Sequence, residues 1–177
     1  TSFYVQAQQD TLFSLSFEDP TLTPEQSGST VLKSIETDYG TVEYLNLSIY
    51  NADKIYHQVE KFGWIDFRSG STTIDETNSY IKLPPIDFVN GGTFFVIYGA
   101  GSTGRKMRLQ EWNGTAWING SYEEVETISS STWYEQNWTI EGSGTKIFRL
   151  VITSSPPIYV TNIDVYGDLG SIDVDCN

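Results

Sequence analysis

Apolar residues recur at every second position in short runs along most of this chain, and Gly, Asn, Ser and Pro separate the runs. Successive side chains of a strand point to opposite faces, so this alternation predicts strands with one buried face. The close spacing of the runs predicts an all-β fold, an antiparallel β-sandwich of the jelly-roll type. The clearest runs are Leu12–Phe17, Thr41–Tyr50, Tyr80–Leu83, Thr93–Tyr98, Lys106–Trp112, Trp133–Ile140, Lys146–Thr153 and Ile158–Tyr166.

The 177 residues suit one domain with a sizeable core. We expect that domain over residues 10–168, after an N-terminal extension or signal remnant at 1–9 and before a C-terminal tail or linker at 169–177. The polar segment Leu22–Lys33 is expected to be a loop, and Asn51–Glu60 to hold a single helical turn.

The formal net charge of −13 restricts the partners of this chain. So acidic a surface repels nucleic acid and anionic membranes, and it favours hard cations such as calcium. No stretch reaches the roughly 18 apolar residues of a membrane span. The single cysteine, Cys176, lies beside the C-terminus and provides neither an internal disulfide nor a cysteine metal cluster.

The segment GAGSTGRK at 99–106 resembles a phosphate-binding loop at first reading. Gly99 and Gly104 have the Walker A separation, but Arg105 stands where the lysine is needed, and no Ser or Thr follows Lys106. The residues after the loop alternate as a strand, whereas a nucleotide site needs a helix there. We therefore expect a β-hairpin and no nucleotide site.

The strand after this loop carries an outward polar row. Met107 and Leu109 are expected to face the core, which turns the alternate residues out, and the same parity turns out three residues of two other strands. If these strands are neighbours, cations, an amide and aromatic rings share one surface, as in sugar-binding sites. A solvated sheet face is the alternative. The predicted outward residues are Lys106, Arg108, Gln110, Trp112, Tyr80, Lys82 and Arg149.

Two further tryptophans are candidates for exposure. Trp117 closely follows an Asn-Gly turn, and Trp64 follows a glycine. A sugar stacks its apolar face on such rings, although packing in the core or as a cap is the other role of each tryptophan. Both are included among the predicted carbohydrate-binding residues.

The order of parts resembles the jelly-roll (β-sandwich) carbohydrate-binding modules of secreted bacterial polysaccharide-degrading enzymes. The similarity covers about residues 10–168 and is carried by FSLSFED near the start, YIKLPPIDFVNGGTFFVIYG in the middle and IYVTNIDVYG at the end. In calcium-bearing members, a structural ion lies where the first and last strands meet. By this resemblance Glu18 and Asp164, with Asp19 beside Glu18, are the expected calcium ligands; solvated acids are the alternative.

No catalytic constellation stands out. The abundant acids have no distinguishing context for glycoside hydrolysis, and the only histidine, His57, lies in KIYHQVE without a lyase signature. We therefore expect a non-catalytic module that is extracellular, belongs to a larger protein and binds a plant or algal cell-wall polysaccharide, with a lean towards an acidic one such as pectin. The alternatives are an adhesion or scaffold domain with a protein partner, and a small polysaccharide lyase that uses Tyr56 and His57.

Overall fold

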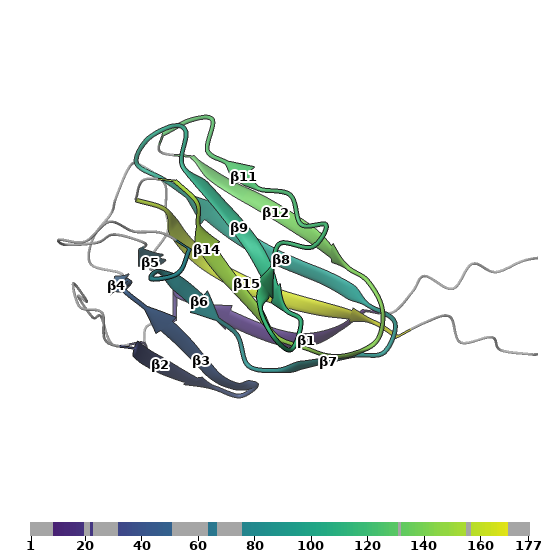
Figure 1. Ribbon diagram of the computed structural model, residues 1–177. Coiled ribbons are helices and arrows are strands. Elements are labelled where there is room, and N and C mark those ends of the chain that lie inside the picture. The colour runs from purple at the N-terminus through teal and green to yellow at the C-terminus, as the bar shows by residue number, and fades with distance from the viewer. Residues whose placement is uncertain are drawn as a thin grey trace, which may run out of the picture.

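The computed structural model describes residues 9–19, 22, 32–50, 64–66, 76–130, 132–154 and 157–169, and these form strands and turns. Two antiparallel sheets make up most of the structure and pack face to face (Figure 1). The predicted all-β sandwich of jelly-roll type is confirmed. Among the described residues, no helix has the length and apolar character to cross a membrane.

The six-stranded sheet has the order β12 (Trp133–Ile140), β8 (Gly92–Gly99), β15 (Tyr159–Asp168), β5 (Trp64–Asp66), β4 (Ser48–Tyr50), and β1 (Gln9–Ser16) also pairs with β15. The seven-stranded sheet has the order β10 (Trp117–Ile118), β9 (Lys106–Trp112), β14 (Phe148–Ile152), β6 (Tyr80–Lys82), β3 (Gly40–Leu45), β2 (Leu32–Thr37), and β11 (Val125–Glu126) pairs with β9. A separate pair joins β13 (Gly144–Lys146) to β7 (Ile86–Phe88).

The core lies between the two sheets, and the alternation of the sequence fills it. Met107 and Leu109 of β9 are fully buried, as predicted, and so are Phe94 and Val96 of β8 in the other sheet. Trp138 is also a core residue and packs edge-on against Phe94. Because the inward residues of β9, β14 and β6 are apolar, their alternate side chains stand on the outer face of the seven-stranded sheet.

Two sequence predictions about connections were wrong. The expected hairpin after Tyr98 does not form, because β8 and β9 belong to different sheets and the glycine loop carries the chain from one sheet to the other. That loop is held by backbone bonds from the N–H of Gly104 to the Thr127 carbonyl and from the N–H of Thr127 to the Arg105 carbonyl. The expected single strand Thr41–Tyr50 is broken at Asn46, whose φ of 58° ends β3, and β4 continues in the opposite sheet.

The segment expected to be a loop, Leu22–Lys33, lies mostly outside the described residues, but its last two residues begin the edge strand β2. The helical turn expected over Asn51–Glu60 lies outside them altogether. At the other end of the sandwich, β1 begins opposite the last residue of β15, since Gln9 pairs with Asp168. The first and last described strands therefore start and finish side by side (Figure 1).

Candidate functional site

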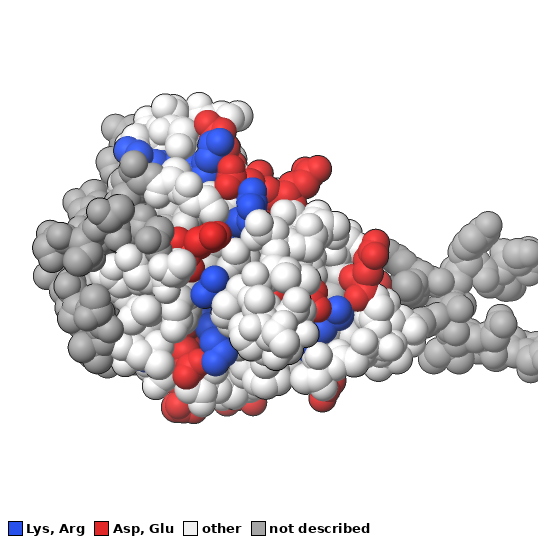
Figure 2. All heavy atoms as spheres, in the orientation of Figure 1, with Lys and Arg blue, Asp and Glu red and all other residues white. Residues whose placement is uncertain are grey.

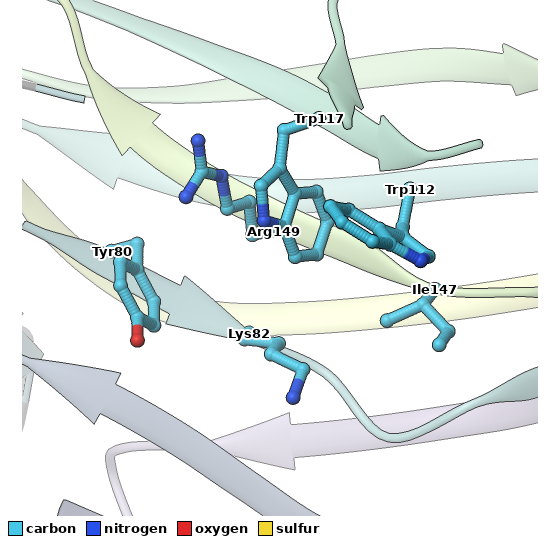
Figure 3. A pocket seen from close by; sticks show the side chains of 6 residues that line it. All are labelled: Tyr80, Lys82, Trp112, Trp117, Ile147 and Arg149. Atoms are coloured by element: carbon cyan, nitrogen blue, oxygen red, sulfur yellow. The ribbon is translucent and has the colours of Figure 1, made fainter. Parts of the chain in front are cut away.

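A cavity of about 310 Å³ opens on the outer face of the seven-stranded sheet. It is ringed by side chains from neighbouring strands of that sheet and from the turns beside them (Figure 3). The lining residues are Tyr80, Lys82, Trp112, Trp117, Ile147 and Arg149. The structure thus brings together five of the residues predicted from sequence, and they come from four different strands.

Strand register explains why these residues meet. Arg149 of β14 lies opposite Gln110 of β9 on one side and opposite Lys82 of β6 on the other. Trp112, two residues beyond Gln110 on the same face, lies opposite Trp117 of β10. The outward residues of four adjacent strands therefore form one continuous surface.

Ile147 is the lining residue that the sequence analysis did not single out. It directly precedes β14, and its backbone carbonyl accepts a hydrogen bond of 2.9 Å from the N–H of Trp112. The alternation that turned Arg149 outward also turns out Ile147, two residues earlier. Parity could therefore have identified it, but an aliphatic residue beside a strand carries no chemical signal of its own.

The guanidinium of Arg149 lies among the rings of the cavity. Its Cζ is 4.6 Å from the centroid of the Trp117 ring and 5.5 Å from that of Tyr80. The side chain faces outward as predicted, yet only 8% of the residue is exposed. Burial lowers the pKa of Arg149, and the opposing charge of Glu76 counteracts part of that effect. Arginine nevertheless stays protonated at neutral pH.

Gln110 was predicted to contact the ligand, but it lies beneath the cavity and is only 4% exposed. Its Oε1 accepts a 2.8 Å hydrogen bond from the Nε of Arg149. Its Nε2 donates to Asn119 Oδ1 at 2.9 Å and to Glu76 Oε2 at 3.1 Å. The buried amide thus joins β14, the segment before β6 and the loop that follows β10.

A tight turn presents Trp117 to the cavity. The Oδ1 of Asn113 accepts hydrogen bonds from the backbone N–H groups of Thr115 and Ala116, at 3.0 and 2.8 Å. Gly114 takes a left-handed φ of 97° within the turn. The turn leads back along β9 and places the Trp117 ring 5.4 Å from the Trp112 ring, at an angle of 59°. The Asn-Gly signal in the sequence therefore marks a real turn.

The remaining predicted cations of this face are paired with acids. Lys106 lies 3.5 Å from carboxylates of both Glu124 and Glu126, and its pKa is raised, chiefly by the charge of Glu126. Arg108 Nη2 lies 3.3 Å from Glu124. Neither Lys106 nor Arg108 lines the cavity. Lys82, which does line it, forms an ion pair with Glu43 of β3. Figure 2 accordingly shows positive and negative groups side by side on this face.

Trp64 does not join this group. It lies on β5, in the six-stranded sheet, whereas the cavity is on the outer face of the opposite sheet. A glycine beside a tryptophan carries no information about which sheet its strand enters. Two residues that the lyase alternative requires, Tyr56 and His57, lie outside the described residues.

The predicted calcium ligands do not come together. Asp164 lies in the middle of β15, opposite Ser14, whose Oγ donates a 2.6 Å hydrogen bond to its carboxylate. Glu18 and Asp19 follow the end of β1, where the chain turns and the N–H of Asp19 donates a 3.3 Å hydrogen bond to the Ser16 carbonyl. Within the described ranges, no group of three or more His, Cys, Asp or Glu side chains is placed to hold a metal ion. Glu18, Asp19 and Asp164 therefore do not form one acidic cluster in the described part of the chain, and calcium binding stays a prediction.

No protein-family model and no curated protein matches the sequence. Solved structures do match the fold. The K3 cleaved adhesin domain of Lys-gingipain from Porphyromonas gingivalis aligns with a TM-score of 0.56 and 12% identity, over 90% of this chain and 99% of that one. The CBM22-1 xylan-binding domain of Paenibacillus barcinonensis Xyn10C aligns with a TM-score of 0.52 and 13% identity, over 94% and 100%.

Carbohydrate-binding modules of families 35 and 36 also match, with TM-scores of 0.45 and 0.41, and the second was solved with calcium and xylotriose. All these identities are 20% or lower, so the likeness concerns the fold. The resemblance expected from the sequence is confirmed at that level: this is the β-sandwich found in carbohydrate-binding modules and in gingipain adhesin domains.

Proposed function

We propose that this chain is a non-catalytic carbohydrate-binding module that holds a plant or algal cell-wall polysaccharide in the cavity on the seven-stranded sheet. One observation carries the proposal: Trp112, Trp117 and Tyr80 surround a cavity that Lys82 and Arg149 also line. Rings offer flat apolar surfaces to the C–H face of a pyranose, and the cations donate hydrogen bonds to its oxygens.

The size of the cavity indicates how much of a polymer it holds. Ligand pockets in proteins commonly measure about 300–1,000 Å³, and this one, at about 310 Å³, is at the small end. One or two sugar residues therefore occupy it, and the rest of the polysaccharide runs out over the surface.

The lining also favours binding over cleavage. The six lining residues include no carboxylic acid and no histidine, whereas glycoside hydrolysis needs a pair of carboxyl groups across the scissile bond. The lyase alternative depends on Tyr56 and His57, and replacing His57 with alanine is expected to leave polymer length and binding unchanged.

We place the module outside the cell, as part of a larger protein. In this proposal residues 10–168 form the module, 1–9 are an extension or signal remnant, and 169–177 are a tail or a linker to further modules. Neither nucleic acid nor membrane is a partner, because a net charge of −13 repels both phosphate backbones and anionic lipids. The proposal uses no metal.

The test is affinity electrophoresis of the purified protein through gels that contain pectins, xylans, β-glucans, mannans or alginate. We expect retardation by one class without shortening of the polymer. Trp117→Ala and Trp112→Ala should each reduce the affinity tenfold or more, because each removes a stacking surface.

The matched control is Trp133→Ala. Trp133 lies on β12 of the other sheet, where it packs against Tyr159 with ring centroids 6.4 Å apart. This variant should bind as the unmodified protein does. Equal losses in all three variants would mean that the cavity is not the site. Absence of retardation by every polymer would overturn the proposal and leave the adhesion or scaffold alternative in first place.

A further inference from the structure

Arg149 forms no ion pair with any of the described residues, although the charge of Glu76 acts on it. Among the described residues, no carboxylate lies within 4.0 Å of its guanidinium, whereas Lys82, Lys106 and Arg108 each have one. Its single hydrogen bond in this part of the chain joins Nε to the neutral amide of Gln110. The two terminal nitrogens, Nη1 and Nη2, therefore remain for a ligand in the cavity.

A mostly buried guanidinium without hydrogen-bond acceptors lowers the stability of the fold. A buried charge is stable in a protein when an opposite charge or hydrogen-bond acceptors accompany it, and only 8% of Arg149 is exposed. The rings of Trp117 and Tyr80 compensate in part through their π faces. They offer no acceptor in the plane of the guanidinium, where a carboxylate binds through two parallel N–H···O bonds.

The acid whose charge acts on Arg149 is Glu76, but no ion pair joins the two among the described residues. Glu76 accepts its hydrogen bond from Nε2 of Gln110, on the side of the amide opposite to the oxygen that meets Arg149. The amide of Gln110 thereby links Arg149 to Glu76 through two hydrogen bonds, one at each end of the amide. The remaining cation of the lining, Lys82, is already neutralised by Glu43. The cavity has room for one negative group, at Arg149.

We propose that the cavity receives a sugar residue bearing a carboxylate, which Nη1 and Nη2 of Arg149 bind, and that this acidic residue stands alone on an otherwise uncharged polysaccharide. This inference rests on the proposed function and specifies its ligand. The sugar ring lies among Trp117, Tyr80 and Trp112 while its carboxylate meets Arg149.

The net charge of the chain favours a ligand with isolated carboxylates over a polymer with a carboxylate on every sugar. A protein with a net charge of −13 repels a polymer that carries one carboxylate per sugar. A positive patch could offset the repulsion, but Lys106 and Arg108, beside the cavity on β9, are paired with Glu124. A pectic polyanion, towards which the sequence leaned, therefore fits this surface less well than a neutral backbone with sparse acidic substituents.

The experiment compares three polymers by affinity electrophoresis and calorimetry: glucuronoxylan, the same glucuronoxylan with its carboxyl groups reduced to hydroxymethyl groups, and polygalacturonate. We expect the native glucuronoxylan to bind at least about tenfold more tightly than its reduced form, since a charge-assisted bidentate contact is lost. Its affinity should fall as NaCl rises, and polygalacturonate should bind more weakly than glucuronoxylan.

Three variants of the full chain locate the contact. Arg149→Lys keeps the positive charge but loses the two parallel N–H donors of the guanidinium, and it should remove the preference for the unreduced polymer. Glu76→Gln removes a like charge while it keeps an acceptor for Gln110, and it should tighten binding of glucuronoxylan a few-fold. Arg105→Lys, in the loop before β9, is the control and should change neither the preference for the unreduced polymer nor the affinity for glucuronoxylan. Thermal unfolding of each variant reports whether it is folded.

The outcomes separate this inference from the proposed function. Equal binding of native and reduced glucuronoxylan, or tighter binding of polygalacturonate, would overturn the inference and leave a carbohydrate-binding module in place. Unchanged affinity in Glu76→Gln, in a folded protein that binds, would also contradict a carboxylate at Arg149. Failure of every polymer in the wider panel to bind would overturn the proposed function itself.

Discussion

Replacing Gln110 with leucine is expected to weaken both the fold and the binding site, although Gln110 does not touch the cavity. Leucine has a similar volume and keeps the site filled, so the change isolates the amide. Three hydrogen bonds disappear: the one accepted from Arg149 and the two donated to Glu76 and Asn119.

These three bonds are not equal in cost. Glu76 and Asn119 are exposed, so water replaces the lost donor at little cost. Arg149 is buried, and its Nε loses a charge-assisted bond of about 1.5–3 kcal/mol with no substitute at that depth. With a few tenths for the other two, the free energy of unfolding should fall by about 2–4 kcal/mol.

Denaturant unfolding followed by tryptophan fluorescence measures this change, and titration with the bound polysaccharide measures the affinity. Gln136→Leu is the matched control, because Gln136 lies on β12 and, among the described residues, its amide bonds only to the adjacent Asn137 carbonyl. That control should alter the free energy of unfolding by less than about 0.5 kcal/mol. If Gln110→Leu behaved like Gln136→Leu in both assays, the buried amide would not be what positions Arg149.

Other features make equally specific predictions. A Cβ at Gly92 would lie 1.9 Å from the Tyr166 carbonyl oxygen and would force β8 away from β15, so Gly92→Ala should prevent a stable fold. Gly114 has a φ of 97° but nothing within 4 Å of its Cβ position, so Gly114→Ala should lower the free energy of unfolding by about 1 kcal/mol, as measured by denaturant unfolding. Because Glu18, Asp19 and Asp164 are not gathered into a site, calcium and EDTA should give the same melting temperature, and a rise with calcium would contradict this reading. Burial alone would raise the pKa of Glu124, but the Thr153 hydrogen bond and the charges of Arg108 and Lys106 outweigh it and lower that pKa. The stability from Glu124 is therefore complete above the unfolded value of about 4.3 and is lost as the pH falls through the folded value, so Glu124→Gln should flatten the acid limb of a stability–pH curve.

Alternation predicted the faces of the strands well, because it is a local property. Whether Met107 faces the core and Arg108 the outer face of the sheet depends on the backbone period, which the sequence displays directly. Sheet membership depends on connections, which the sequence displays poorly. Strand β8, a glycine loop and β9 read equally as a hairpin or as a crossing between sheets, and the loop's bonds to Thr127 come from a distant segment. Asn46 was not recognised as the end of β3, because apolar residues continue on both sides of it in TVEYLNLSIY, although its backbone has a left-handed φ.

The site shows the same division between local and distant information. Parity placed Tyr80, Lys82, Trp112 and Arg149 outward, and the Asn-Gly turn marked Trp117, but only strand order could bring them together. The sequence did not predict that another segment would cover an outward residue. Gln110 faces outward by parity, but it is buried and bonds to Asn119 of the loop after β10. The low exposure of Arg149 is what indicates a ligand. An arginine in solvent is hydrated and needs no partner, whereas one packed against Trp117 and Tyr80 gains from an acceptor.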